Sequence, residues 1–178
     1  IPLIQTIFNP LSQAKHLAGN ETLLSHVKNN AEELLVGLQT ITDTTIDFLE
    51  VCQQVNVDGF FYAVQHAQNG QLTESEYKRF GMHFDEKIIA SMSNTWLNML
   101  HIHGTNVYFQ LLSKSAFQII NWHDQHTKPS LTEARQLTQA SLCGGIRQWE
   151  SLVYGSPQSV RRECKKSIEE MENTGFVL

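Results

Sequence analysis

Short apolar runs alternate with longer amphipathic stretches along the chain, and this alternation restricts the possible folds more than any other feature. Six runs are too short for helices and are predicted as strands, at residues 1–7, 58–62, 96–103, 117–122, 141–146 and 175–178. Strand-helix-strand repetition with largely apolar strands is typical of parallel pairing through right-handed crossovers. The sequence therefore predicts the α/β class.

The segments between the predicted strands carry helix signals. Residues 32–55 place apolar side chains close to a 3.6-residue period, which predicts a one-sided helix packed on the sheet. "TESE" from Thr73 and "SLTE" from Ser130 match the capping box at a helix start. Ser156 followed by proline predicts another helix start.

Length, charge and cysteine content narrow the class of protein. A chain of 178 residues fits one domain over residues 1–178. The net charge of −5 argues against a nucleic-acid partner. No apolar run is long enough to span a membrane, and the first residues lack the features of a signal peptide. Three widely spaced cysteines favour reduced thiols and a cytoplasmic location.

The two ends of the chain predict an incomplete sheet. The sequence opens directly on a predicted strand and stops after "TGFVL", whereas a parallel strand inside a sheet has neighbours on both sides. A closed barrel of alternating strands and helices has eight strands. We therefore expect a fragment of such a barrel, whose open edges and exposed inner face make it self-associate.

Two histidines in "LHIHG" form the main candidate site. Side chains alternate along a strand, so His101 and His103 share a face, with Cα atoms about 7 Å apart. Gly104 marks the carboxyl end of the strand, where sites form in barrels. Both rings can then converge on one metal ion. The alternative is one hydrogen-bonded core histidine and one that lines a pocket.

Three further segments supply polar groups at strand ends. "INWHDQH" adds His123 and Asp124, which can orient a ligand or form a polar capped loop. Gln65 and His66 follow the "FFYA" strand and are candidates for hydrogen bonding to substrate, with a solvated loop as the alternative. The pair Gly144 and Gly145 permits a close approach of the backbone.

An ordered set of segments resembles the uroporphyrinogen decarboxylase family over essentially the whole chain. The set is "IPLIQTIFNPLSQAKHLAG", "VDGFFYAVQ", "LTESEYKRFGMHFDEKII", "LHIHG", "FQIINW", "SLTEARQ", "LCGGI" and "SPQSVRRECKKSIEEM" followed by "GFVL". The resemblance implies a (β/α)8 barrel, of which this chain supplies strands three to eight. It also implies two chemistries. One is cofactor-free decarboxylation of a tetrapyrrole or related polycarboxylate; the other is zinc-dependent methyl transfer with corrinoid proteins or thiols.

For the zinc chemistry, "LHIHG" resembles the family motif HxCG, with His103 in place of the cysteine. The resemblance implies a third ligand, a cysteine, after the last strand and beyond Leu178. For the decarboxylase, the family's active-site tyrosine falls on His16 and its serine on Val64 or Gln65, so neither residue type is kept.

The first functional hypothesis is a lyase with His101, His103 and Asp124 in a catalytic pocket and no cofactor. Its substrate-binding candidates are His16, Gln65, His66, His123, Gly144 and Gly145. The second is a methyltransferase with zinc on His101 and His103 and a corrinoid protein as partner. A binding module or an inactive fragment is the third. The sequence leaves the oligomeric state open, with a homodimer as one candidate.

Overall fold

The computed structural model describes all 178 residues and contains one sheet of six parallel strands in sequence order, β1-β2-β3-β4-β5-β6. The strands are β1 (Ile4–Phe8), β2 (Gly59–Val64), β3 (Met99–Ile102), β4 (Ile119–Trp122), β5 (Ser141–Cys143) and β6 (Phe176–Val177). Each predicted strand is present, with its ends moved by a few residues. The prediction of an α/β protein with a parallel sheet is confirmed.

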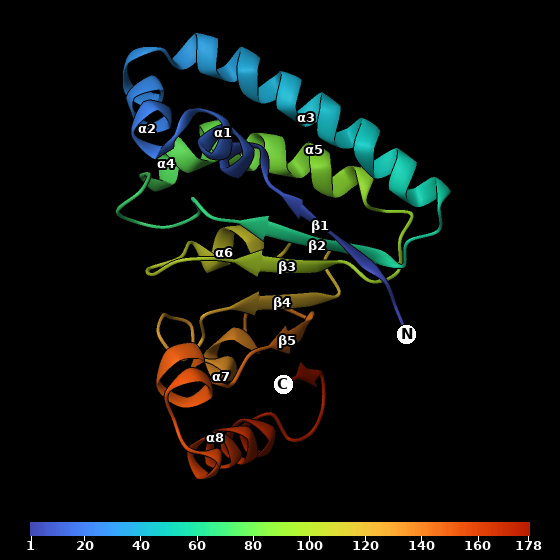
Figure 1. Cartoon of the computed structure of the whole chain (residues 1–178), viewed down its shortest axis with the longest axis vertical. Coiled ribbons are helices and arrows are strands. Elements are labelled where there is room, and N and C mark those ends of the chain that lie inside the picture. Colours follow the sequence, from blue (N-terminus) through green and yellow to red (C-terminus); the bar gives the residue numbers. More distant parts are fainter.

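Helices occupy the connections between the strands (Figure 1). They are α1 (Pro10–Ala18), α2 (Asn20–Asn29), α3 (Ala31–Gln54), α4 (Glu74–Tyr77), α5 (His83–Ser91), α6 (Phe109–Leu112), α7 (Leu131–Ala134) and α8 (Pro157–Glu170). Two π-helical segments, Lys78–Met82 and Gln148–Val153, complete the set. This order of parallel strands and helical crossovers is that of part of a (β/α)8 barrel.

The predicted helix starts are confirmed. Thr73 and Ser130 each accept from the backbone of the residue three positions on, and a glutamate there bonds back, which completes both capping boxes. Ser156 caps α8, with proline at the first helical position. None of the helices combines the length and the apolar composition that crossing a membrane requires.

The packing of α3 differs from the prediction. We expected this helix to lie on the sheet, but its main neighbours are α1, α2 and α5, and Figure 1 shows it as the outermost layer above α1 and α5. The nine-residue helices α1 and α5 lie between α3 and the sheet.

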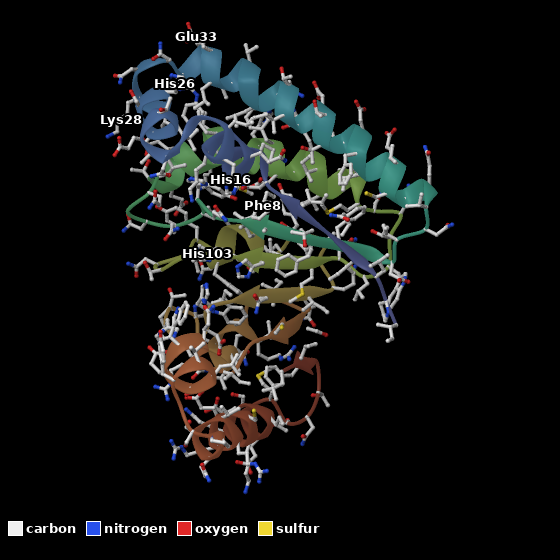
Figure 2. The ribbon with its side chains drawn as sticks, in the orientation of Figure 1. Phe8, His16, His26, Lys28, Glu33 and His103 are labelled. Carbon is white, nitrogen blue, oxygen red and sulfur yellow. The ribbon has the colours of Figure 1, made fainter.

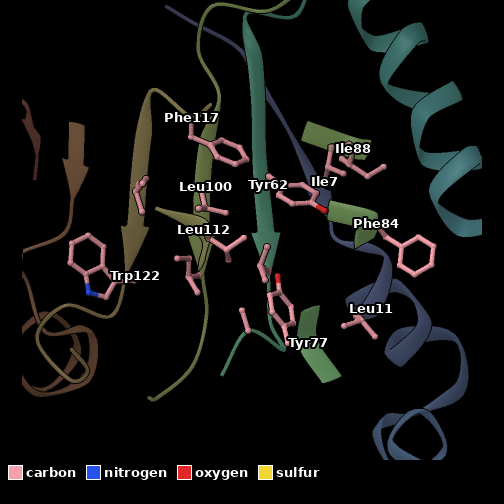
Figure 3. Close-up of a cluster of buried hydrophobic side chains, with 14 of the residues drawn as sticks. Ile7, Leu11, Tyr62, Tyr77, Phe84, Ile88, Leu100, Leu112, Phe117 and Trp122 are labelled. Atoms are coloured by element: carbon pink, nitrogen blue, oxygen red, sulfur yellow. The ribbon is translucent and has the colours of Figure 1, made fainter. Parts of the chain in front are cut away.

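One apolar core fills the space between the sheet and its helices (Figure 3). Alternate residues of the strands point into it, including Tyr62 and Leu100, which are completely buried. Trp122 is also buried, and its indole nitrogen donates to the Pro129 carbonyl oxygen. The other face of the sheet carries polar side chains such as His101 and Asn121 among apolar ones such as Phe61.

Gly59, the first residue of β2, lies tightly against the backbone of Leu97. A Cβ added there would lie 1.7 Å from the backbone oxygen of Leu97. We expect Gly59→Ala to lower the free energy of unfolding by about 1–3 kcal/mol, because backbone atoms must move. Gly37→Ala is the control, since a Cβ in the middle of α3 meets nothing within 4 Å. Urea denaturation of both variants measures the difference; equal stability would contradict the expectation.

Candidate functional site

The register of the central strands puts three polar side chains in one row. His101 of β3 pairs with Asn121 of β4, which pairs with Cys143 of β5. These residues alternate with core residues such as Leu100 and Ile120, so they lie on the face of the sheet away from the helices. His103 lies two residues after His101, and His123 lies two residues after Asn121. Both therefore come directly after the carboxyl ends of β3 and β4. This edge of the sheet is called the rim below.

Three imidazoles converge at the rim. One ligand atom from each of His101, His103 and His123 lies within 4.8 Å of the other two. His123 Nε2 and His103 Nδ1 are 3.2 Å apart, and the three ring centroids are 5.1–5.9 Å from one another. Figure 2 shows His103 at the strand end, where β3 enters its loop. These three residues form the histidine cluster.

Asn121 orients His101 within the cluster. The amide nitrogen of Asn121 donates to the Cys143 carbonyl oxygen at 2.9 Å, so its amide oxygen faces His101 Nδ1 at 2.6 Å. An amide oxygen is an acceptor, which places the imidazole proton on Nδ1 and leaves Nε2 with a lone pair. Phe61 stacks on the same ring, with centroids 5.5 Å apart. His101 is therefore held in a fixed orientation, with a lone pair left on Nε2.

Burial favours the neutral form of two of these rings. The pKa of His101 is lowered chiefly by burial and further by the two neighbouring imidazoles, against a hydrogen bond to Asn121 that raises it. Burial also lowers the pKa of His123, followed by repulsion from His103 and His126. A neutral imidazole is the form that ligates a metal. His103 is the exposed member and faces the solvent side of the cluster.

Asp124 lies beside the cluster but bonds elsewhere. Its carboxylate accepts from the Gly145 amide at 3.0 Å and from Gln125 at 2.6 Å, and it makes no ion pair with a histidine. A Cβ at Gly144 would meet an Asp124 oxygen at 2.3 Å. The close backbone approach predicted for Gly144 and Gly145 is thus present, with Asp124 as the group approached. Burial raises the pKa of Asp124.

The remaining candidates gather at the ends of β1 and β2. His16 is exposed and packs edge to face on Phe8, with ring centroids 5.3 Å apart. Gln65 is half-buried and accepts from the Lys15 ammonium group at 3.3 Å. His66 is 2% exposed, so it is not the solvated loop residue of the alternative interpretation. The backbone amide of His103 donates to the Val64 carbonyl oxygen, which joins this group to the histidine cluster.

Sequence reasoning located the pair, and the resemblance implied a third ligand beyond Leu178, which lies outside this chain. The structure also brings His123 to the pair. The signal was present in the sequence, because β4 is parallel to β3 and "INWH" places its histidine one step past the strand end, as "LHIH" does. Asn121 was missed because an asparagine within an apolar strand carries no motif. Asn121 lies opposite His101 because of the register between β3 and β4, which a reading of either strand alone does not give.

The fold and site define a class: a parallel α/β barrel protein with histidines at the carboxyl ends of adjacent strands. The family model described as uroporphyrinogen decarboxylase (URO-D) matches residues 1–178. The chain therefore belongs to the uroporphyrinogen decarboxylase family.

A solved methyltransferase from Methanosarcina mazei has a similar fold, with a TM-score of 0.83 at 17% sequence identity. The match covers 96% of this chain and 50% of that one, so the chain spans about half the length of the methyltransferase. A comparison with curated proteins gave no match.

Proposed function

We propose that this chain belongs to a methyl-transfer enzyme in which His101, His103 and His123 hold a zinc ion. The observation that carries the proposal is the convergence of three imidazoles within 4.8 Å at the rim. The similarity of fold to a methyltransferase supports it. Zinc bound there would lower the pKa of a coordinated thiol and so supply a thiolate nucleophile near neutral pH.

The donor set fits zinc. With zinc–nitrogen bonds of about 2.1 Å, two nitrogens of a tetrahedral site lie about 3.4 Å apart. His103 Nδ1 and His123 Nε2 are already 3.2 Å apart, and the farthest pair in the cluster is within 4.8 Å. Three protein ligands with one open position is the arrangement of catalytic rather than structural zinc sites.

The residues around the cluster have separate parts in the proposed reaction. Asn121 fixes the His101 ring, and the exposed side of His103 leaves the cluster open to a thiol substrate. Zinc held by the three histidines would favour loss of the thiol proton to solvent at the rim. The thiolate sulfur would then take the methyl group from a methylated corrinoid, and the electron pair of the broken carbon–cobalt bond would stay on the corrinoid.

Decarboxylation is the second candidate, and Asp124 favours it. Burial raises the pKa of this carboxyl, so it retains a proton closer to neutral pH than an exposed aspartate does. Such a group can protonate a pyrrole ring, after which the bond to carbon dioxide breaks and its electrons return to the ring. This route uses no metal.

Metal content and two assays separate the candidates. We expect the purified full chain to hold about one zinc ion, measured by mass spectrometry, and to transfer methyl from methylcobalamin to a small thiol. Asp124→Asn is the control and should retain both properties. A metal-free chain that decarboxylates uroporphyrinogen, and loses this activity in Asp124→Asn, would overturn the methyl-transfer proposal.

A further inference from the structure

The loop after β3 carries His103 and runs between two other loops of the rim. It covers residues 103–108 and joins β3 to α6. Asn121 holds the ring of His101. The exposed ring of His103 has one hydrogen-bond partner, His123, which belongs to the histidine cluster itself. The position of His103 in the cluster therefore depends on the backbone of its loop.

Gln68, from the loop after β2, holds this loop on one side. Its amide oxygen accepts from the Thr105 amide at 3.1 Å, and its amide nitrogen donates to the Gln65 carbonyl oxygen at 2.8 Å. The same amide group packs on Gly104, where an added Cβ would lie 2.3 Å from it. An antiparallel bridge between Gln68 and Val107 continues the contact. The backbone thus engages both the donor and the acceptor of this half-buried side chain, which holds it in one orientation.

Thr127, from the loop after β4, holds the loop of His103 on the other side. Its hydroxyl oxygen accepts from the Asn106 amide at 2.9 Å. Its own backbone amide donates to the His123 carbonyl oxygen, also at 2.9 Å. Asn106 has a φ of 53°, in the left-handed region that asparagine adopts more readily than most residues. Hydrogen bonds therefore connect the loop after β2, the loop of His103 and the loop of His123 in one row.

We propose that Gln68 and Thr127 are positioning residues for the zinc site, which hold the loop of His103 in the conformation that brings its ring to the other two imidazoles. Neither residue belongs to the histidine cluster. Both act by preorganisation, because a loop that is already ordered loses less conformational entropy when the ion binds. This inference rests on the proposed function, since it takes zinc as the ligand of the cluster.

The zinc affinity of the folded full chain tests the contact made by Gln68. We expect Gln68→Met to raise the zinc dissociation constant about tenfold, because methionine fills similar space but leaves the Thr105 amide without its acceptor. Gln71→Met is the matched control, since Gln71 lies on the same loop but has an exposed side chain that makes no hydrogen bond. This control should bind zinc as tightly as the wild type. Competition with a chromophoric chelator measures the constants.

Two substitutions of Thr127 separate its hydrogen bond from the shape of its side chain. Thr127→Val keeps the shape but removes the oxygen that accepts from Asn106, so it should also raise the zinc dissociation constant about tenfold. Thr127→Ser keeps the oxygen and should bind zinc like the wild type. Equal constants for Thr127→Val and Thr127→Ser would overturn the role of Thr127, and equal constants for Gln68→Met and Gln71→Met would overturn that of Gln68.

Amide hydrogen exchange in the zinc-free chain tests both contacts without the metal. We expect faster exchange of the Thr105 amide in Gln68→Met and of the Asn106 amide in Thr127→Val, because each amide loses its acceptor. Exchange that is unchanged in both variants would overturn the proposal.

The wild-type chain separates this inference from the proposed function. A wild-type chain that binds no zinc would overturn both together. A wild-type chain that binds zinc, with the same affinity in Gln68→Met and Thr127→Val, would overturn this inference alone.

Discussion

Alanine at both His101 and His103 is expected to abolish stoichiometric zinc binding by the full chain. Zinc sites in small proteins bind with about 10–16 kcal/mol, so each ligand contributes roughly 3 kcal/mol. Loss of one ligand should therefore lower the affinity about 100-fold, and loss of two about 10,000-fold. Competition with a chromophoric chelator measures these constants.

Two further variants test whether the loss of zinc is specific to the histidine cluster. His126→Ala removes a histidine from the same loop as His123, but His126 pairs with Glu150 at 3.3 Å and lies outside the cluster. It should keep its zinc. Asn121→Leu removes the partner of His101 Nδ1 and should lower affinity about 10–100-fold. If the double alanine variant still held one zinc ion per chain, the metal would be bound at another site and the proposed zinc site would be wrong.

The fold was largely predictable because its signals are local and repeated. Short apolar runs gave the strands, and the side chains of Thr73, Ser130 and Ser156 gave helix starts within the chain itself. The position of α3 was not predictable in this way. Its apolar face fits helices as well as a sheet, and the surface it covers is settled only by tertiary packing on α1, α2 and α5.

The candidate site was predictable within a strand and less so between strands. Alternation places His101 and His103 on one face without any knowledge of their neighbours. Contacts between strands depend on register. For this reason the sequence did not predict that Asn121 bonds to His101 or that His123 joins the two histidines of β3. Asp85 is a further case: it lies in a helix with polar neighbours, where an aspartate is ordinarily solvated, yet it is completely buried.

Replacing Asp85 with alanine is expected to lower the free energy of unfolding by about 3–5 kcal/mol. The carboxylate accepts from Asn9 at 3.1 Å, from Tyr62 at 2.7 Å and from the Tyr77 hydroxyl, and it thereby ties α5 to the start of α1, to β2 and to α4. Removing it leaves three buried donors without an acceptor, each costing about 1–3 kcal/mol. Urea denaturation near pH 7 measures the loss; a smaller loss than about 1 kcal/mol would contradict the role of this network.

The same carboxyl makes stability depend on pH. Burial raises the pKa of Asp85 to about 6, although hydrogen bonds from Tyr77, Tyr62 and Asn9 lower it. An unfolded aspartate has a pKa of about 3.9, so the folded state binds more protons between these values. The contribution of Asp85 to the free energy of unfolding is therefore largest below about pH 4 and falls by about 2 kcal/mol as the pH rises from 4 to 6.

His66 has the opposite effect over nearly the same range. Its folded pKa of about 4 is below the unfolded value of about 6.5, so its contribution falls by about 3 kcal/mol as the pH drops between them. In the wild type, the pH dependences that Asp85 and His66 give to the free energy of unfolding largely cancel. A variant that lacks one of the two groups shows the effect of the other. Relative to wild type, Asp85→Asn should lose about 2 kcal/mol of stability as the pH falls from 6.5 to 4, whereas His66→Gln should gain about 2–3 kcal/mol. Parallel pH profiles for wild type and both variants would show that neither group is perturbed by its burial.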